Sequence, residues 1–347
     1  MAKVAINGFG RIGRTFFKMA QNNPDFEVVA INDLGDLENL AYLLRYDTAY
    51  GRSDFSVEVK DGHLVVDGKD IKFLQERDPK ALPWKDMDID IVVEATGVFA
   101  SYEKSKMHLE AGSKRVIISG PVKDDPVASG VTGATVLMGV NDNLLSTCEI
   151  SSNASCTTNA TSPLMAILKE SIGIDKAVLN TVHAYTATQA IVDGPVRGSD
   201  FRKGRAAAQN IIPTSTGAAI ATTKAHTEFE NKFDGIAIRV PVPVGSIVDV
   251  TFIATENTTV EAVNYALTEA ASSSRWKNLF AVTDEPIVSS DIIGAEFASI
   301  ADLSMTRVVD GNLVKVLAWY DNETSYTHTL VEHVSTVAKF FNQKQGA

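Results

Sequence analysis

Cysteine is scarce in this sequence, because Cys148 and Cys156 are the only two among 347 residues. Two thiols are too few for a disulfide framework, and such usage is typical of a reducing compartment. Each of the two cysteines therefore needs an explanation of its own.

Long apolar runs are also missing, and no window of the sequence is apolar enough over the length that a bilayer requires. The chain leads directly into a short apolar stretch, Lys3–Ile6, without the basic and apolar regions of a secretory signal. We therefore expect a soluble, cytoplasmic protein.

Positive charge is in deficit: 32 Lys and Arg stand against 43 Asp and Glu, a formal net charge of −11. No basic run stands out that could follow a nucleic-acid backbone or an anionic membrane, so neither partner is indicated. An anionic substrate would have to be held by donors placed locally around it.

What the chain does have is a hydrophobic content of 45%, enough over this length for a large core and two domains. Its first part reads as strand, glycine turn, helix and strand, the opening of a parallel βαβ unit. Asp-Gly pairs at 61–62 and 67–68 predict antiparallel hairpins appended to that sheet. The elements predicted here are strands Lys3–Ile6, Phe26–Ile31, His63–Val66, Ile89–Glu94 and Arg115–Ser119, and helices Arg11–Gln21 and Tyr102–Ala111.

After Cys156 the pattern changes to a helix, a long polar loop and valine-rich alternating runs, which predicts an α+β domain on an antiparallel sheet. A last helical pattern should pack back onto the first domain. The elements are the helix Thr157–Glu170, the loop Tyr185–Gln209, the alternating runs Ile236–Ala254 and Leu313–Trp319, and the C-terminal helix Ser325–Phe341.

The turn after the first strand carries the motif G-x-G-x-x-G, made by Gly8, Gly10 and Gly13 with Arg11 and Ile12 between the last two. Its position between a strand and a helix is the context that dinucleotide binding requires. The glycines permit a tight turn, let pyrophosphate approach the backbone and let the helix pack closely. The phosphates then meet the positive end of the helix dipole.

Asp33 strengthens this interpretation over that of a purely structural turn. It lies about 20 residues after the last glycine, at the tip of the second strand, where a carboxylate binds the ribose 2′-hydroxyl. A 2′-phosphate would add about −1.5 to −2 charges beside that carboxylate. The sequence therefore predicts NAD and not NADP.

Two further turns, Thr96-Gly97 and Ser119-Gly120, end later strands of the same sheet. Ligands of such sheets lie at the carboxyl ends of the strands, so these residues are candidates for cofactor contacts. Ordinary strand-ending turns explain them nearly as well.

Cys156 precedes an apolar helical run and should sit at or near a helix N-terminus, where backbone N–H groups and the dipole favour a thiolate. His183, after a strand-like run and before a polar segment, is the best partner among six histidines. On spacing alone a small buried side chain is the more common explanation of a single cysteine.

Cys148 is interpreted as structural, and the remaining histidines as structural or solvated, with His328 and His333 on the surface of a C-terminal helix. Cys148 lies in a mixed apolar run, and the two cysteines do not form a C-x-x-C pair, so no metal site is predicted. The histidines expected in turns, on surface helices or near the C-terminus are His63, His108, His226, His328 and His333.

The sequence resembles the glyceraldehyde-3-phosphate dehydrogenase family over essentially its whole length. The segments that carry the resemblance are VAINGFGRIGR (4–14), SNASCTTN (152–159), TVHAYTATQ (181–189), GRAAAQNIIPTSTGAA (204–219), Arg239-Val240-Pro241 and WYDNE (319–323).

This resemblance implies an α/β chain with a Rossmann-type dinucleotide-binding domain, residues 1–155 and 322–347, and an α+β catalytic domain with a mostly antiparallel sheet, residues 156–321. It implies that Cys156 attacks the aldehyde carbon while His183 takes the thiol proton. A thiohemiacetal and then a thioester would follow, and inorganic phosphate would release an acyl phosphate.

The resemblance also implies the binding residues. Arg239 would serve two phosphate sites, because a guanidinium can donate to two sets of oxygens. Asn322 would hold the nicotinamide carboxamide and Tyr326 would pack against the ring. The other residues implied are Arg77 toward the cofactor, Thr186 and Thr188 toward the substrate phosphoryl group, and Ser155, Thr157, Thr216 and Gly217 toward inorganic phosphate.

The long polar loop lies at a subunit interface in the family, which implies a homotetramer. Its Gly194-Pro195 pair is the one expected in NAD-using members. Ala160 stands where many relatives have a second cysteine, so we predict a single reactive thiol. Ser325, Ala190 and Ile220 are further departures, and the last two replace frequent lysines near the anion sites.

Two alternatives remain open at this stage. Erythrose-4-phosphate dehydrogenase shares the cysteine motif and would differ around the phosphate-binding segments. A non-catalytic scaffold of the same fold is the other alternative, and the intact set Cys156, His183, Arg239 and Asn322 weighs against it.

Overall fold

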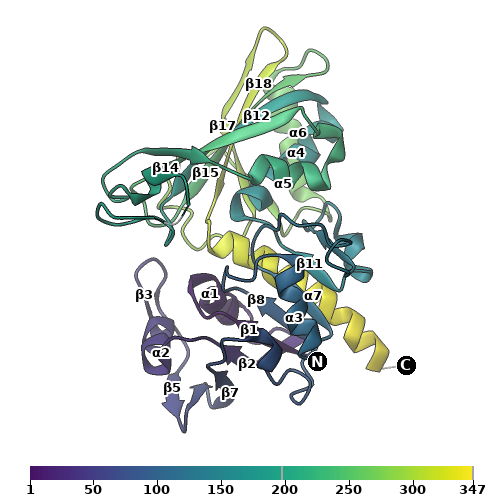
Figure 1. Cartoon of the computed structure of the whole chain (residues 1–347). Coiled ribbons are helices and arrows are strands. Elements are labelled where there is room, and N and C mark those ends of the chain that lie inside the picture. The colour runs from purple at the N-terminus through teal and green to yellow at the C-terminus, as the bar shows by residue number, and fades with distance from the viewer. Residues whose placement is uncertain (197, 346–347) are drawn as a thin grey trace. The chain divides into compact units, whose positions relative to one another are not determined.

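The computed structural model describes residues 1–196 and 198–345 (Figure 1). Contacts divide the chain into two compact units. Unit 1 comprises Met1–Ala154 and the stretch from Thr327 onward, and unit 2 comprises Ser155–Tyr326. No helix in the described part of the chain combines the length and the apolar character that a membrane span requires.

Unit 1 is built on a sheet with the strand order β10-β11-β9-β8-β1-β2-β7-β6-β5. The pairs from β10 to β7 are parallel, and β6 and β5 extend the sheet antiparallel. The fold prediction for this part is confirmed. The strands are β1 (Ala2–Asn7), β2 (Phe26–Asn32), β5 (Val57–Lys60), β6 (His63–Val66), β7 (Lys69–Leu74), β8 (Ile91–Glu94), β9 (Arg115–Ile118), β10 (Gly133–Thr135) and β11 (Ile150–Ser152), with a small separate hairpin of β3 (Tyr46–Asp47) and β4 (Gly51–Arg52).

The hairpin turns in this sheet follow from local chemistry. Asp61 and Gly62 have φ of 51° and 78°, and Asp67 and Gly68 have 45° and 77°. Positive φ at both central residues is what a two-residue turn needs to match the twist of its strands, and Asp-Gly adopts it readily. The predicted hairpins are therefore confirmed.

Helices and a continuous apolar core cover this sheet. Strand β8 is buried along its whole length, as expected for the centre of a parallel sheet. Its Val92 packs in one core cluster with Trp84 and Tyr102. The helical elements are α1 (Arg11–Met19), α2 (Leu37–Arg45), α3 (Tyr102–Glu110), most of α7 (Thr324–Gln345) and the short turns η1 (Pro79–Ala81) and η2 (Asp142–Ser146).

The C-terminal helix α7 packs on unit 1, as predicted. Ser335 accepts a hydrogen bond from Asn23 at 3.1 Å, and Lys339 pairs with Asp25 at 3.5 Å. The interpretation of its His333 as a surface side chain is wrong, however. His333 is fully buried and bonds to Ser151 Oγ at 2.7 Å.

Unit 2 is built on a sheet with the order β13-β14-β12-β15-β18-β17-β16, and helices α4, α5 and α6 lie beside it (Figure 1). Most pairs are antiparallel, as predicted, but β12 pairs with β14 in parallel, and so does β16 with β17. The elements are α4 (Cys156–Ser171), β12 (Ile174–Ala184), η3 (Phe201–Gly204), β13 (Ile212–Ser215), α5 (Ala218–Ala225), η4 (Thr227–Phe229), β14 (Phe233–Val240), β15 (Ser246–Ala254), α6 (Val260–Ser272), β16 (Phe280–Thr283), β17 (Ser299–Val309) and β18 (Leu313–Tyr320).

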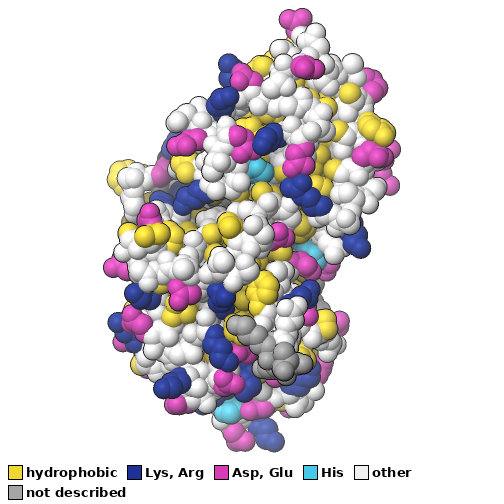
Figure 2. Space-filling model, turned by 90° about the vertical axis from the view of Figure 1, so that its right-hand side faces the viewer, with side chains coloured by type: hydrophobic (Ala, Val, Ile, Leu, Met, Phe, Trp, Pro, Cys, Tyr) yellow, Lys and Arg dark blue, Asp and Glu magenta, His cyan; other side chains and the backbone are white. Residues whose placement is uncertain are grey.

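Acidic and basic side chains are interspersed over the face of the molecule that Figure 2 shows. This mixture is consistent with the absence of a basic run in the sequence. An anionic ligand must therefore find its donors within a local site.

Candidate active site

Cys156 is the first residue of helix α4. Ser155 caps this helix, because its hydroxyl accepts a hydrogen bond from the backbone N–H of Thr158 at 3.1 Å. The residue as a whole is half-buried, and its thiol lies in the first turn of the helix. The predicted location of the thiol is confirmed.

His183 lies near the end of β12, with its side chain buried. Its Nε2 is 3.3 Å from Cys156 Sγ, which is within hydrogen-bond reach for sulfur. The structure therefore brings together the two side chains that the sequence selected.

A backbone carbonyl orients the imidazole of His183. Its Nδ1 is 2.6 Å from Ala184 O, and Arg239 Nη1 donates to the same oxygen at 2.9 Å. Arg239 Nη1 is also 2.7 Å from Nδ1, but a guanidinium only donates. Nδ1 can therefore make only one of its two contacts as a hydrogen bond, by donating to Ala184 O or by accepting from Arg239. The tautomer that donates to Ala184 O, the shorter contact, leaves a lone pair of Nε2 facing the sulfur.

The parallel pairing of β12 with β14 explains the position of Arg239. His183 and Arg239 are direct partners in the register of these two strands. Side chains of paired residues leave the same face of a sheet, so the guanidinium lies beside the imidazole. Arg239 was predicted from the family resemblance only, because no sequence pattern indicates that these two strands pair in parallel.

Burial controls the charges of this pair. It raises the pKa of the Cys156 thiol, against the opposing effects of Arg239 and Thr157. Burial and then Arg239 lower the pKa of His183 to about 3. Burial therefore opposes the charged form of each group, while Arg239 and Thr157 favour the thiolate that the helix terminus was expected to stabilise.

Tyr320, which the sequence analysis did not select, supports both catalytic candidates. Its buried hydroxyl bonds to Thr157 Oγ1 at 2.9 Å and to Thr181 Oγ1 at 2.8 Å. Its ring meets the His183 ring edge to face at 5.9 Å. Tyr320 could have been found from the sequence, because it belongs to the WYDNE segment, in which the sequence analysis assigned a role only to Asn322.

The residues proposed for anion binding occupy several elements of unit 2. Thr186 and Thr188 lie together, with their hydroxyl oxygens 2.9 Å apart, and Thr188 is exposed. Gly217 is the N-cap of α5, and Thr216 Oγ1 accepts from Ala218 N at 3.1 Å. These hydroxyls and backbone groups can meet an anion.

The glycine turn in unit 1 borders a cavity of about 380 Å³ at the carboxyl ends of the strands. A Cβ added at Gly10 would meet open space, whereas one at Gly13 would lie 2.1 Å from Gly8 O. The turn is therefore open toward a ligand and closed toward the sheet, which suits a pyrophosphate. The cavity is lined by Asn7, Gly8, Gly10, Asn32, Asp33, Leu34, Glu76, Arg77, Ala95, Thr96, Val98 and Phe99.

Asp33 is held in place at this cavity by the backbone. Its Oδ2 accepts from Phe9 N at 2.6 Å, and its Oδ1 accepts from Gly35 N at 2.7 Å. A carboxylate has further lone pairs, so both oxygens can still receive a ribose hydroxyl. The residues present therefore fit a dinucleotide.

The cavity does not gather all the predicted cofactor residues. Arg11 pairs instead with Asp47 at 3.2 Å. Asn322, in unit 2, accepts at its Oδ1 from Gly245 N and Ser246 Oγ, each at 3.1 Å. The others outside the lining are Ile12, Gly13, Gly97, Ser119 and Tyr326.

The lining residues that the sequence analysis missed belong mostly to strand ends. Asn7 ends β1 and Asn32 ends β2, so each directly precedes a residue that was selected. Their position at the carboxyl end of a parallel strand could have predicted that they line the cavity.

A parallel dinucleotide-type sheet in one unit, and a thiol beside an imidazole in the other, are features that suit an NAD-dependent oxidoreductase. Comparison with known families agrees. "Glyceraldehyde 3-phosphate dehydrogenase, NAD binding domain" matches residues 2–102, and "Glyceraldehyde 3-phosphate dehydrogenase, C-terminal domain" matches residues 155–322. The chain belongs to the glyceraldehyde-3-phosphate dehydrogenase family.

Similar proteins extend over nearly the whole chain. A glyceraldehyde-3-phosphate dehydrogenase of Clostridium acetobutylicum is 46% identical over 98% of this chain and 99% of its own length. One of Geobacillus stearothermophilus is 46% identical over 97% and 98%. Glyceraldehyde-3-phosphate dehydrogenase A of Escherichia coli is 43% identical over 97% and 99%. NAD is accordingly the cofactor of this chain.

Proposed function

We propose that this chain oxidises and phosphorylates glyceraldehyde 3-phosphate to 1,3-bisphosphoglycerate with reduction of NAD, in cytoplasmic glycolysis and gluconeogenesis. The observation that carries the proposal is the 3.3 Å contact between Cys156 Sγ and His183 Nε2. The relatives named above support the choice of substrate.

The two halves of the chain have separate tasks in this proposal. Residues 1–155 and 322–347 form the dinucleotide-binding domain, and residues 156–321 form the catalytic domain. Gly8, Gly10, Asp33, Arg77 and Thr96 hold NAD at the cavity of unit 1. Asn322 and Tyr326 hold the nicotinamide end.

The first chemical step joins the substrate to sulfur. Cys156 Sγ bonds to the aldehyde carbon while its proton passes to His183 Nε2 along the existing contact. His183 returns the proton to the new oxyanion, which the Cys156 N–H also meets. The product is a neutral thiohemiacetal.

The second step is the oxidation. When bound, NAD supplies the acceptor for the hydride that leaves the thiohemiacetal carbon. His183 Nε2 takes the hydroxyl proton at the same time, so the carbon becomes the carbonyl of a thioester on Cys156.

The third step releases the product. An oxygen of inorganic phosphate bonds to the thioester carbonyl, the C–S bond breaks, and the Cys156 thiolate recovers its proton from His183. Arg239 stabilises the developing anions through its fixed guanidinium beside the imidazole. Thr186 and Thr188 hold the substrate phosphoryl group.

The attacking phosphate has its own donors in this proposal, namely Ser155, Thr157, Thr216 and Gly217. The Thr157 hydroxyl already bonds to Tyr320, so it would add one contact to the phosphate beside those of the other three residues.

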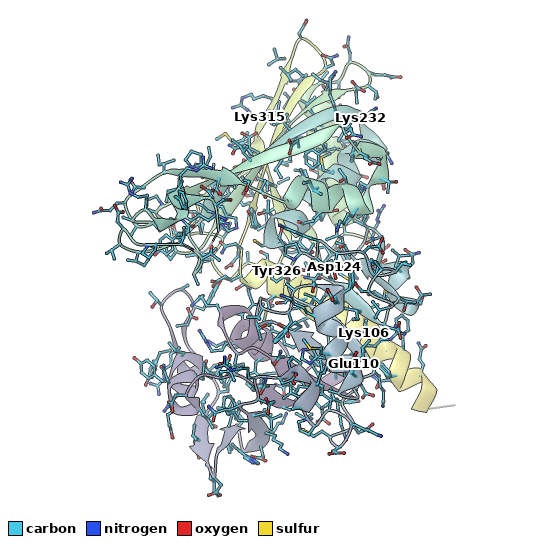
Figure 3. All side chains as sticks on the ribbon, in the orientation of Figure 1. Lys106, Glu110, Asp124, Lys232, Lys315 and Tyr326 are labelled. Carbon is cyan, nitrogen blue, oxygen red and sulfur yellow. The ribbon has the colours of Figure 1, made fainter. Side chains whose placement is uncertain are left out.

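We further propose that copies of the chain assemble into a homotetramer through the sheet face of unit 2 that α4, α5 and α6 do not cover. Val178 and Ile236 are 60% and 52% exposed on neighbouring strands. A hollow of about 870 Å³ is lined by residues of this sheet and of α5, and also by Lys232, which Figure 3 labels. Contiguous exposed apolar side chains are typical of an interface.

The test of the reaction is a steady-state assay that follows NADH absorbance. We expect turnover of glyceraldehyde 3-phosphate that requires inorganic phosphate and exceeds turnover of erythrose 4-phosphate. The opposite preference would identify an erythrose-4-phosphate dehydrogenase. Binding of NADH without turnover of either aldehyde would identify a scaffold.

A further inference from the structure

A buried carboxylate stands directly behind the dinucleotide cavity of unit 1. Glu94 ends strand β8 and is 1% exposed. Its Oε1 accepts from the backbone N–H of Thr96 at 2.8 Å and also from the Thr96 hydroxyl. Its Oε2 accepts from Asn7 Nδ2 at 2.5 Å. The carboxylate thus binds two residues that line the cavity.

The glycine turn rests on the segment that Glu94 holds. A Cβ at Gly8 would lie 2.6 Å from Thr96 N, so the two backbones are in direct contact. Any shift of Thr96 must therefore move the turn that is to receive the pyrophosphate. Asn7 extends the connection, since its Oδ1 accepts from Asn32 Nδ2 at 2.7 Å on the opposite wall.

Two aromatic side chains hold Glu94 from behind. Trp84 Nε1 donates to His108 Nδ1 at 3.1 Å, and His108 Nε2 is 3.1 Å from Glu94 Oε2. An indole N–H can only donate, so His108 Nδ1 must accept and Nε2 must carry the proton toward Glu94. Both aromatic side chains are fully buried, and His108 lies on α3, the helix whose Lys106 and Glu110 are labelled in Figure 3.

The direction of the bonds from Trp84 to Glu94 is thereby fixed. Asn7 Nδ2 also lies 3.4 Å from His108 Nε2, but with this tautomer both atoms donate to Glu94 Oε2 and not to each other. Trp84 sets the tautomer of His108, His108 orients the carboxylate, and the carboxylate fixes Thr96 and Asn7. Buried networks in which each polar group has its partner are rigid and specify one arrangement. The function of such rigidity here is to preorganise a binding surface.

We propose that Glu94, His108 and Trp84 are positioning residues for the dinucleotide, acting on its affinity through Thr96 and Asn7. The inference rests on the proposed function of the cavity as the NAD site. Because the chain of bonds lies wholly within unit 1, it acts on cofactor binding and not on the steps at Cys156.

The test compares Glu94→Gln, Trp84→Phe and the double variant by calorimetric titration with NADH. Four donors face the two oxygens of Glu94, and Glu94→Gln replaces one oxygen by an amide N–H₂ group that confronts two of them. We therefore expect the dissociation constant to rise about 10-fold or more. Trp84→Phe keeps an aromatic ring but removes the N–H, and a rise of about 3-fold is expected. The double variant should bind no more weakly than Glu94→Gln, because Trp84 acts through Glu94.

Tyr102→Phe is the matched control. It removes a buried hydroxyl from α3 and from the same core as Trp84, but outside the chain of bonds, and NADH binding should not change. A steady-state readout separates positioning from general damage: the KM for NAD should rise in both single variants, with kcat at saturating NAD within about twofold of the parent.

The outcomes are distinct. Unchanged NADH binding in Glu94→Gln and Trp84→Phe, or equal weakening in Tyr102→Phe, would overturn the inference. Additive losses in the double variant would also overturn it, since they would mean independent roles. Failure of the parent protein itself to bind NADH would instead contradict the proposed function of the cavity.

Discussion

At the scale of single residues, the proposed chemistry depends on a proton that moves between two neutral groups. Burial raises the pKa of the Cys156 thiol and lowers the pKa of His183, and Sγ and Nε2 lie 3.3 Å apart. Arg239 favours the thiolate and disfavours the imidazolium, so it adjusts both ends of the transfer. Ala184 O fixes which nitrogen takes part.

His183→Asn should lower kcat by about 10²- to 10⁴-fold, the usual contribution of a general base. Binding of NADH should stay as in the parent, because His183 belongs to unit 2 and the cavity to unit 1. Steady-state rates and a NADH titration measure the two effects. A variant with parental kcat would rule out His183 as the base.

His333 makes a separate residue-scale prediction about pH. Burial lowers its pKa to about 3, below the value of about 6.5 expected when the chain is unfolded. Between these values only the unfolded chain binds this proton, so the related stability is complete above pH ~6.5 and lost as the pH falls toward 3.

Between pH 6.5 and pH 5, wild type should therefore lose about 1.5 kcal/mol more unfolding free energy than His333→Leu. Urea unfolding at the two pH values measures the difference. Parallel losses in the two proteins would show that His333 has no such linkage.

At the scale of elements, the strand–turn–helix unit β1–α1 has one glycine that the fold requires and one that the ligand requires. A side chain at Gly13 collides with Gly8 O, whereas a side chain at Gly10 meets open space. The two positions therefore separate stability from binding.

Gly10→Ala should fold with near-parental thermal stability and lose NADH affinity, because its methyl group occupies the approach of the pyrophosphate. Gly13→Ala should lower the melting temperature by several degrees, since the backbone must move to accept it. Thermal unfolding and NADH titration test both. Parental affinity in Gly10→Ala would exclude the turn as the phosphate site.

The elements also show what the sequence could and could not predict. The glycine turn, Asp33, Cys156 and His183 were found from local patterns, and the strands of unit 1 follow from their apolar runs. The pairing of His183 with Arg239 was not predictable, because the sequence between β12 and β14 does not reveal a parallel pair.

The sequence analysis repeatedly failed to predict polar side chains that are buried. His108 and His333 were interpreted as surface histidines, yet both are fully buried in hydrogen-bonded networks. On α3 the buried face itself carries polar residues, Ser105 and His108, so apolar periodicity does not mark it. Glu94, at the end of a buried strand, was missed because two of its partners, Asn7 and His108, come from other segments.

The structure shows the local surroundings of three residues that depart from the family pattern. Ser325 donates through its hydroxyl to Ala295 O at 2.9 Å and accepts from Asp321 N at 3.0 Å. Ala160 is fully buried within α4, so one reactive thiol remains the prediction for this helix. Ile220 is 62% exposed and borders the hollow over the sheet of unit 2.

At the scale of the whole molecule, the proposed tetramer predicts that a charge placed on the exposed sheet face of unit 2 weakens assembly. Ile236→Asp places a charge among exposed apolar side chains, so light scattering should show a smaller assembly. Tyr265→Asp is the matched control, because Tyr265 is 67% exposed on α6, away from that face. An unchanged mass for Ile236→Asp would exclude this face as an interface.

The central claim, that Cys156 carries the substrate as a thioester, is tested most directly by rapid mixing without phosphate. Wild type with NAD and glyceraldehyde 3-phosphate should release a burst of about one NADH per chain, followed by slow turnover until phosphate is added. Cys156→Ser should give no burst, because a serine hydroxyl is scarcely ionised near neutral pH. A full burst from Cys156→Ser would contradict the account.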